Sequence, residues 1–123
     1  MISVNAPFSA YMVSGDRDQL LRIFSNLIKN SAQAIPDFSE GKIAINLDTD
    51  GNTVTVEIND NGSGISEDQK DKIFSPNFTT KSSGMGLGLA MVKNMVDQMN
   101  GKIWFSTVYG KGTSFFVSLP AVK

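Results

Sequence analysis

A β-hairpin pattern in the middle of the chain restricts the fold more than any other feature. Residues 42–49 (KIAINLDT) and 53–60 (TVTVEIND) each alternate apolar and polar side chains, and Asp50-Gly51-Asn52 between them is a turn sequence. Alternation with a period of two directs one face of a hairpin toward a core and the other toward water. The sequence therefore predicts an antiparallel sheet that needs a covering layer on one face.

Two longer segments have the period of amphipathic helices and can supply that layer. The first is expected to begin at Asp16, which forms a capping box with Gln19, and to run to about Ile35. The second is expected over residues 86–99, closed by Asn100-Gly101. Both helices would place their apolar side chains against the sheet.

The remaining segments complete the predicted element order. Strands are predicted at 8–14, 102–108 and 113–119, a turn at 109–112, a short helix capped by Ser66 over 66–73, and an irregular loop at 75–85. Strands paired by hairpins, with helices on one face, predict an α/β fold built as a two-layer sandwich. A chain of 123 residues is most simply one domain.

Composition restricts the chemistry that such a domain can perform. The chain has no Cys and no His, which excludes disulfides, thiolate nucleophiles, Cys-ligated zinc and imidazole bases. Carboxylates, amides, hydroxyls, ammonium groups, backbone N–H groups and an oxygen-bound metal such as Mg²⁺ remain. A net charge of −1 gives no basic surface for nucleic acid, and the short apolar runs exclude a membrane span. We expect a soluble, cytoplasmic domain without direct membrane contact.

The turn Asp60-Asn61-Gly62-Ser63-Gly64 follows a strand predicted to be buried. A carboxylate only accepts hydrogen bonds, so in a closed pocket Asp60 would suit an exocyclic amine such as that of adenine. Gly62 and Gly64 would let a flat ligand approach the backbone. A plain tight turn is the alternative interpretation, because Asp and Gly are common in turns.

Two amides lie on one margin of the first predicted helix. Asn26 and Asn30 are four residues apart and therefore about 40° apart around the helix axis. Their oxygens could complete the shell of a Mg²⁺ ion that already carries phosphate oxygens and waters. The alternative is that both amides bond to neighbouring backbone groups or to water.

Two further segments suggest phosphate binding. The glycine-rich run 84–90 (GMGLGLA) leads into the second helix, whose first N–H groups could bind phosphate, although close helix packing explains such glycines equally well. Residues 74–81 (FSPNFTTK) combine two aromatics, hydroxyls and a lysine. This loop could fold over a phosphate tail as a lid or could be an ordinary solvated loop.

The order of these motifs resembles the ATP-binding catalytic domain of two-component sensor histidine kinases, within the GHKL ATPase and kinase superfamily. The closing segment 112–115 (GTSF) is similar to the G-T-x-F strand of that family. The resemblance implies a mixed five-stranded sheet with three helices on one face, in a single domain over residues 1–123. It also implies that the chain is part of a longer sensor that carries the phospho-acceptor histidine elsewhere.

The resemblance also implies the cofactors, ATP and Mg²⁺, and the residues that hold them. The catalytic residues would be Asn26, Asn30 and Lys81, with Asn30 as the metal ligand and Lys29 as an alternative to Lys81 for the phosphates. The nucleotide-binding residues would be Asp60, Gly62, Gly64, Ile65, Phe74, Thr80, Gly84, Gly86, Leu87, Gly88 and Thr113.

The activity implied by the resemblance is ATP-dependent protein-histidine kinase activity. The γ-phosphate would pass to a histidine on a dimerising helical hairpin of the parent protein, with a response regulator downstream. GHKL hydrolases carry a glutamate four residues before the magnesium asparagine, where this chain has Asn26, and an amide cannot take a proton from water. A serine-directed kinase of the anti-sigma-factor type, a GHKL ATPase and a non-catalytic docking module remain alternatives.

Overall fold

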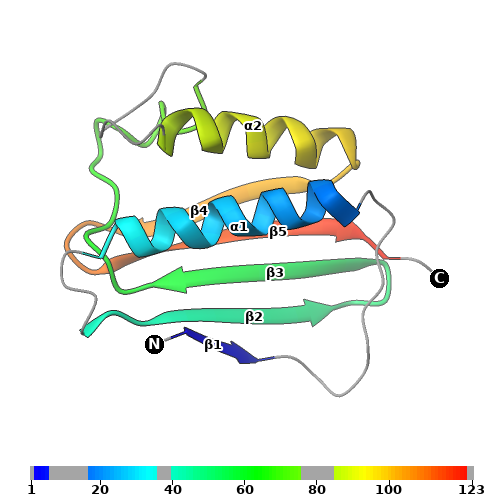
Figure 1. Ribbon diagram of the computed structural model, residues 1–123, viewed down its shortest axis with the longest axis horizontal. Coiled ribbons are helices and arrows are strands. Elements are labelled where there is room, and N and C mark those ends of the chain that lie inside the picture. The colour runs from blue at the N-terminus through cyan, green and yellow to red at the C-terminus, as the bar shows by residue number, and fades with distance from the viewer. Residues whose placement is uncertain (1, 6–16, 36–39, 76–84, 122–123) are drawn as a thin grey trace.

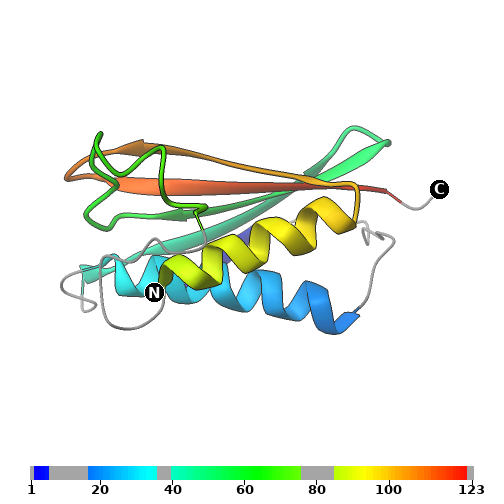
Figure 2. The same cartoon turned by 90° about the horizontal axis from the view of Figure 1, so that it is seen from above.

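The computed structural model describes residues 2–5, 17–35, 40–75 and 85–121, which form two layers (Figure 1). The elements are β1 (Ile2–Asn5), α1 (Arg17–Gln33), β2 (Ile43–Thr49), β3 (Thr53–Asp60), α2 (Met85–Gln98), β4 (Lys102–Val108) and β5 (Gly112–Pro120). Figure 2 shows both helices against the same face of the sheet. The predicted two-layer α/β arrangement is therefore confirmed.

The sheet has the strand order β1-β2-β3-β5-β4. β1 pairs with β2 in parallel, and the other three pairs are antiparallel. In the register of β3 with β5, Asp60 lies opposite Thr113. The last residue of β3 is thereby placed beside the first residues of β5, at the left-hand end of Figure 1, where α1 also ends.

The core fills the space between the sheet and the two helices. Its fully buried side chains include Ile23, Leu27, Ile43, Ile58, Ile73, Val92, Val96 and Val117. The opposite face of the sheet is open and carries polar side chains beside a stacked pair, Trp104 and Phe116, whose ring centroids are 5.3 Å apart. One covered and one open face is the arrangement that the alternation of β3 predicts.

The predicted central hairpin is confirmed, and its turn is held by Asp50. One carboxylate oxygen, Oδ1, accepts hydrogen bonds from the N–H groups of Asn52 and Thr53, both at 2.8 Å. These donors lower the pKa of Asp50 below its ordinary value, because they stabilise the charged form. Gly51 takes a φ of +92°, which suits glycine at this turn position.

The predicted third helix, over residues 66–73, is wrong. Residues 67–74 form consecutive turns, in which the N–H groups of Gln69, Lys72 and Ser75 each donate to the carbonyl three residues earlier. Ser66 does not cap a helix, because its hydroxyl donates to the Asp68 carboxylate at 2.6 Å. The described residues therefore contain two α-helices rather than three.

The N-terminal part of the prediction has a different outcome. The first described strand is Ile2–Asn5, whereas the strand expected at 8–14 and the capping residue Asp16 lie outside the described residues. The other four strands are found within one residue of the predicted positions. Within the part of the chain that the structure describes, no helix is both long and apolar enough to cross a membrane.

The end of α2 shows how the chain turns from the helix into β4. Asn100 has a φ of +61°, its N–H donates to the Asp97 carbonyl at 3.1 Å, and the Gly101 N–H donates to the Val96 carbonyl at 3.0 Å. These two bonds form a Schellman motif, in which the residue of positive φ is normally glycine. Asparagine is the other residue type that tolerates this conformation.

Replacement of Asn100 tests this helix end. Asn100→Ala should lower the free energy of unfolding by about 1 kcal/mol, because a β-carbon disfavours positive φ, whereas Asn100→Gly should not lower it. Asn94→Ala, at an exposed position inside α2, is the matched control and should leave stability unchanged or slightly raised. Urea unfolding measures all three variants, and an Asn100→Ala variant as stable as wild type would contradict the prediction.

Candidate functional site

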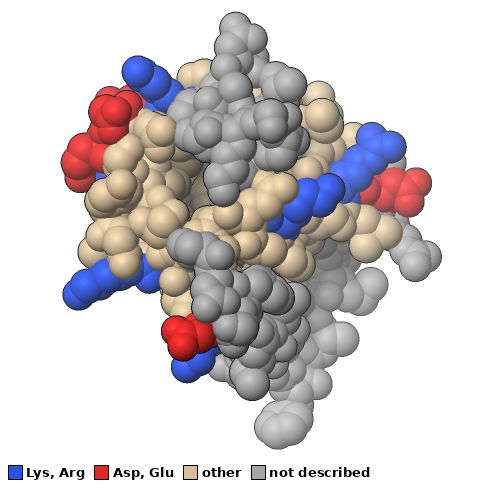
Figure 3. Space-filling model, turned by 60° about the vertical axis from the view of Figure 1, so that its left-hand side comes forward, with Lys and Arg blue, Asp and Glu red and all other residues tan. Residues whose placement is uncertain are grey.

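A pocket of about 320 Å³ opens where β3 ends, between the end of α1, the start of α2 and the β4–β5 turn. It is lined by Asn30, Gln33, Ala34, Asp60, Ser63, Gly64, Ile65, Ser66, Gln69, Ile73, Leu89, Tyr109, Thr113 and Phe115. Figure 3 shows this end of the molecule, where uncharged residues form most of the described surface between scattered Lys, Arg, Asp and Glu. Asp60 is the one carboxylate among the described lining residues.

Asp60 ends β3 at a position that faces the helices, in line with the buried residues Val56 and Ile58. Its side chain is only 3% exposed, and the Gly62 N–H donates to its Oδ1 at 2.9 Å. Burial raises the pKa of Asp60 above its ordinary value, although the hydrogen bond from the Gly62 N–H lowers it in part. No Lys or Arg among the described residues forms an ion pair with it.

A buried carboxylate without a cationic partner accepts hydrogen bonds and therefore favours ligands that donate them. It lies in a wall that also contains Ile65, Ile73, Leu89 and Phe115, and it has no cation to neutralise it within the described chain. A ligand group that donates hydrogen bonds, such as an amine, would stabilise the charged form, whereas a carbonyl would be repelled.

The glycines of the Asp60 turn are required by the packing of the chain itself. A β-carbon on Gly62 would lie 2.5 Å from the Ala34 carbonyl oxygen, and one on Gly64 would lie 2.6 Å from that of Val108. The turn also forms hydrogen bonds with two other segments. The Ser63 N–H donates to the Ala34 carbonyl at 2.9 Å, and the Ser63 carbonyl accepts from the Gly110 N–H at 2.7 Å. The turn is thus fixed between the end of α1 and the β4–β5 turn.

The two predicted amides of α1 have different surroundings. Asn30 lines the pocket, is 6% exposed, and its amide nitrogen has no hydrogen-bond partner among the described residues. Asn26 does not line the pocket, and its amide donates to the Arg22 carbonyl at 2.9 Å, one helical turn earlier. Of these two amides, Asn30 is the one that offers an unused polar group to a ligand in this pocket.

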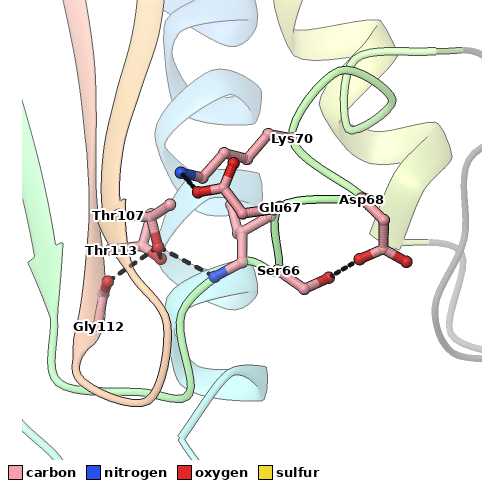
Figure 4. Close-up of polar contacts among 8 residues, drawn as sticks. Ser66, Glu67, Asp68, Lys70, Thr107, Gly112 and Thr113 are labelled. Carbon is pink, nitrogen blue, oxygen red and sulfur yellow. Dashed lines mark hydrogen bonds and ion pairs between the residues drawn. The ribbon is translucent and has the colours of Figure 1, made fainter.

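Thr113 lies beside Asp60 and is held by a residue that sequence reasoning did not find (Figure 4). Thr113 is 4% exposed, and its hydroxyl lies 2.9 Å from that of Thr107. The Thr107 hydroxyl also accepts a hydrogen bond from the Ile65 N–H, at 3.0 Å. The sequence holds one signal for Thr107, because it is polar at a position of β4 that shares a face with the core-packed residues Ile103 and Phe105.

The other predicted residues form three groups: Phe74, three residues at the start of α2, and three residues outside the described chain. Phe74 packs against Phe105, with ring centroids 6.1 Å apart, and is not a lining residue. Gly86, Leu87 and Gly88 lie within the first turns of α2. Thr80, Lys81 and Gly84 fall outside the described residues, so their predicted roles stay predictions.

The lining residues that the sequence did not indicate come from turns and from the core. Gln33 and Ala34 lie at the end of α1, Ser63 lies within the Asp60 turn, and Ser66 and Gln69 follow that turn. Tyr109, which is 72% exposed, belongs to the β4–β5 turn. A single sequence gives no signal for these residues, because the pairing of the strands brings these turns together and the sequence of each turn does not record that pairing.

Comparison with known proteins identifies the family of this chain. Residues 15–123 match the family described as histidine kinase-, DNA gyrase B- and HSP90-like ATPase. The sensor histidine kinase ZraS of Escherichia coli (strain K12) is 42% identical over 108 residues, which are 88% of this chain and 23% of ZraS. Sporulation kinase B of Bacillus subtilis (strain 168) is 34% identical over 110 residues, which are 89% of this chain and 26% of that kinase.

Solved structures agree with the sequence comparison. The catalytic domain of histidine kinase ThkA, in a nucleotide-free form, superimposes with a TM-score of 0.84 at 32% identity, over 97% of this chain and 77% of that one. The chain spans about a quarter of the length of the bacterial kinases that it matches. The chain belongs to the histidine kinase-, DNA gyrase B- and HSP90-like ATPase family and, within it, to the catalytic domains of sensor histidine kinases.

Proposed function

We propose that the chain binds Mg·ATP with the adenine in the Asp60 pocket and transfers the γ-phosphate to a histidine of a partner dimerisation domain. The observation that carries the proposal is Asp60, a buried acceptor without a cationic partner in the described chain, in a largely apolar pocket. The exocyclic amine of adenine supplies the missing donor. Guanine would present a carbonyl oxygen at the same place and would be repelled.

Asn30 is the residue that fits a magnesium ion. Its carboxamide is buried in the pocket, and the assignment of its nitrogen and oxygen is interchangeable, so the oxygen can face a cation. Among the described residues there is no cluster of three or more Asp, Glu, His or Cys that could hold a metal. Mg²⁺ suits such a site, because it keeps waters and phosphate oxygens and needs few protein ligands. The ion would neutralise phosphate charge.

Transfer to a separate acceptor fits the site better than hydrolysis. The chain contains no histidine, so the acceptor belongs to another segment or another chain. Within the described pocket, Asp60 is the one carboxylate and stands at the adenine end, which leaves no carboxylate to activate water. The amide of Asn26 cannot take a proton and is bonded to the helix backbone. The chain would therefore bind and position the phosphoryl donor for a cytoplasmic sensor that acts on a response regulator.

Nucleotide binding tests the role of Asp60. In Asp60→Asn the Gly62 N–H would hold the amide oxygen, which leaves an NH₂ group facing the amine of adenine. Titration calorimetry should show ADP binding weakened roughly 10- to 100-fold, the range expected for loss of a hydrogen bond to a charged group. Asp97→Asn, on the exposed side of α2, is the matched control and should bind like wild type. Equal affinity of Asp60→Asn and wild type would contradict the adenine assignment.

The raised pKa of Asp60 predicts that the ligand-binding carboxylate lowers stability. In the pH range just above 3.8 the folded chain holds the Asp60 proton more tightly than the unfolded chain, so this group makes stability fall as pH rises. Asp60→Asn lacks that cost and should be more stable than wild type at pH 7, with a difference that shrinks as pH falls toward 3.8 and is absent below it. Urea unfolding at several pH values measures the difference, and a less stable variant at pH 7 would contradict the prediction.

The transfer reaction can be tested with a dimerisation domain that carries an acceptor histidine. With radiolabelled ATP and Mg²⁺, the label should appear on that domain as acid-labile, base-stable phosphate, and none should appear on this chain. Asn30→Ala should reduce transfer at least tenfold and should remove the effect of Mg²⁺ on ATP affinity, whereas Asn94→Ala should not. Acid-stable phosphoserine would favour the serine-directed kinase, and steady phosphate release without an acceptor would favour the ATPase.

A further inference from the structure

Tyr109 is an exposed aromatic side chain at the mouth of the Asp60 pocket. It is 72% exposed and yet lines the pocket, whose other aromatic lining residue, Phe115, is 4% exposed. Within the part of the chain that the structure describes, the Tyr109 ring contacts no other aromatic ring and its hydroxyl forms no hydrogen bond. Folding therefore leaves most of the apolar area of this ring in water.

The turn that carries Tyr109 does not itself require an aromatic residue. The Lys111 N–H donates to the Val108 carbonyl at 2.9 Å, which makes residues 108–111 a four-residue turn, and Gly110 at its third position has a φ of +84°. Positive φ at the third position is characteristic of type II turns, which favour proline at the second position, where Tyr109 lies. Neither the turn nor the core accounts for the ring, which leaves the pocket as the place where it can act.

The main chain at Tyr109 is fixed against the turn that holds the Asp60 carboxylate. A β-carbon on Gly64 would lie 2.9 Å from the Tyr109 Cα, so the two backbones are in direct contact. The Gly110 N–H also donates to the Ser63 carbonyl at 2.7 Å. The Tyr109 ring therefore starts from a fixed point beside the pocket, and only its two side-chain torsions have to be ordered when a ligand binds.

A flat ligand in this pocket has two faces to cover. Buried apolar side chains of the wall, among them Ile73 and Leu89, can cover one face of a ring whose amine reaches Asp60. Tyr109 is the exposed aromatic lining residue and can cover the other face from the solvent side. Stacking of a base on an aromatic ring needs no particular hydrogen-bonding edge, so it adds affinity without changing which base Asp60 admits.

We propose that Tyr109 is a further nucleotide-binding residue, whose ring stacks on the outer face of the adenine base held by Asp60. This inference rests on the proposed binding of an adenine nucleotide and deepens it. Asp60 selects the base by its amine, and Tyr109 holds the base by its face. Binding also removes the exposed Tyr109 ring from water, which favours the complex.

Titration calorimetry with Mg·ADP on a series of variants tests the contribution of the ring. Tyr109→Ala should bind about tenfold more weakly than wild type, which is within the range of base–aromatic stacking. Tyr109→Phe and Tyr109→Trp retain an aromatic ring and should bind within about twofold of wild type. Tyr109→Leu retains apolar area without a ring, so its binding should also be weaker than that of wild type, although less so than that of Tyr109→Ala.

Val108→Ala is the matched control for these variants. Val108 is 57% exposed, precedes Tyr109 in the same turn and does not line the Asp60 pocket, so Val108→Ala should bind ADP like wild type. Because the Tyr109 side chain is exposed, Tyr109→Ala should unfold at the same urea concentration as wild type. Unfolding therefore separates a loss of binding from a loss of folding.

Nuclear magnetic resonance of the chain labelled in its tyrosine rings observes the contact directly. The chain has two tyrosines, so the spectrum of Tyr109→Phe identifies the Tyr109 signals by their loss. Addition of Mg·ADP should shift the Tyr109 ring protons upfield through the ring current of the base. It should also produce nuclear Overhauser effects between these protons and the protons of the adenine ring.

Each outcome supports or overturns the stacking. Wild-type affinity in Tyr109→Ala or Tyr109→Leu overturns it, and so do Tyr109 ring signals that stay in place when wild type is saturated with ADP. A Tyr109→Phe variant as weak as Tyr109→Ala would assign the effect to the hydroxyl and also overturns it. If wild type does not bind ADP, the proposed function itself fails, which is a different result from ADP binding that is indifferent to the residue at position 109.

Discussion

The pocket depends on keeping the carboxylate of Asp60 out of water. A buried, unpaired carboxylate raises its own pKa and costs stability, so the surrounding structure must hold it in place. The backbone does this, because the Gly62 N–H bonds the carboxylate and the sheet register places Thr113 opposite it. The charge is only partly compensated in the protein alone. Because this compensation is incomplete, a ligand that donates a hydrogen bond to Asp60 would bind favourably here.

The need to hold the buried Asp60 carboxylate in place also explains why three segments that are distant in the sequence are hydrogen-bonded to one another around the pocket. The Asp60 turn contacts the end of α1 through Ser63 and Ala34, and the β4–β5 turn through Gly110. These contacts are possible because β3 and β5 pair with Asp60 facing the helices. A shift of one residue in that pairing would place Asp60 on the open face of the sheet. The hydrophobic pattern of β3 therefore fixes the orientation of the Asp60 side chain.

Sequence patterns correctly predicted the parts of the fold that depend on interactions between adjacent residues. The central hairpin, the end of α2 at Asn100 and the position of Asp60 each follow from a few adjacent residues. The short helix at 66–73 was wrong because the Ser66 hydroxyl bonds Asp68 instead of capping the next turn. Asn26 and Asn30 could not be told apart by spacing, and only packing shows that Asn30 faces the pocket. Tyr109 depends on contacts between turns far apart in the sequence, which no local pattern records, and the one local sign of Thr107 is a polar residue on the core-facing side of β4.

The distribution of carboxylates and amides also fits the proposed transfer to an acceptor outside this chain. Hydrolysis needs a base beside the water that attacks phosphorus, and a base there must be able to take a proton. In the described pocket the one carboxylate, Asp60, already stands opposite Thr113, while the helix margin carries the amides of Asn26 and Asn30. A site built from amides can hold phosphate and a cation without activating water. Under the proposed function, such a site would keep the phosphoryl group until a nucleophile arrives from elsewhere, because a chain without histidine cannot supply an imidazole nucleophile itself.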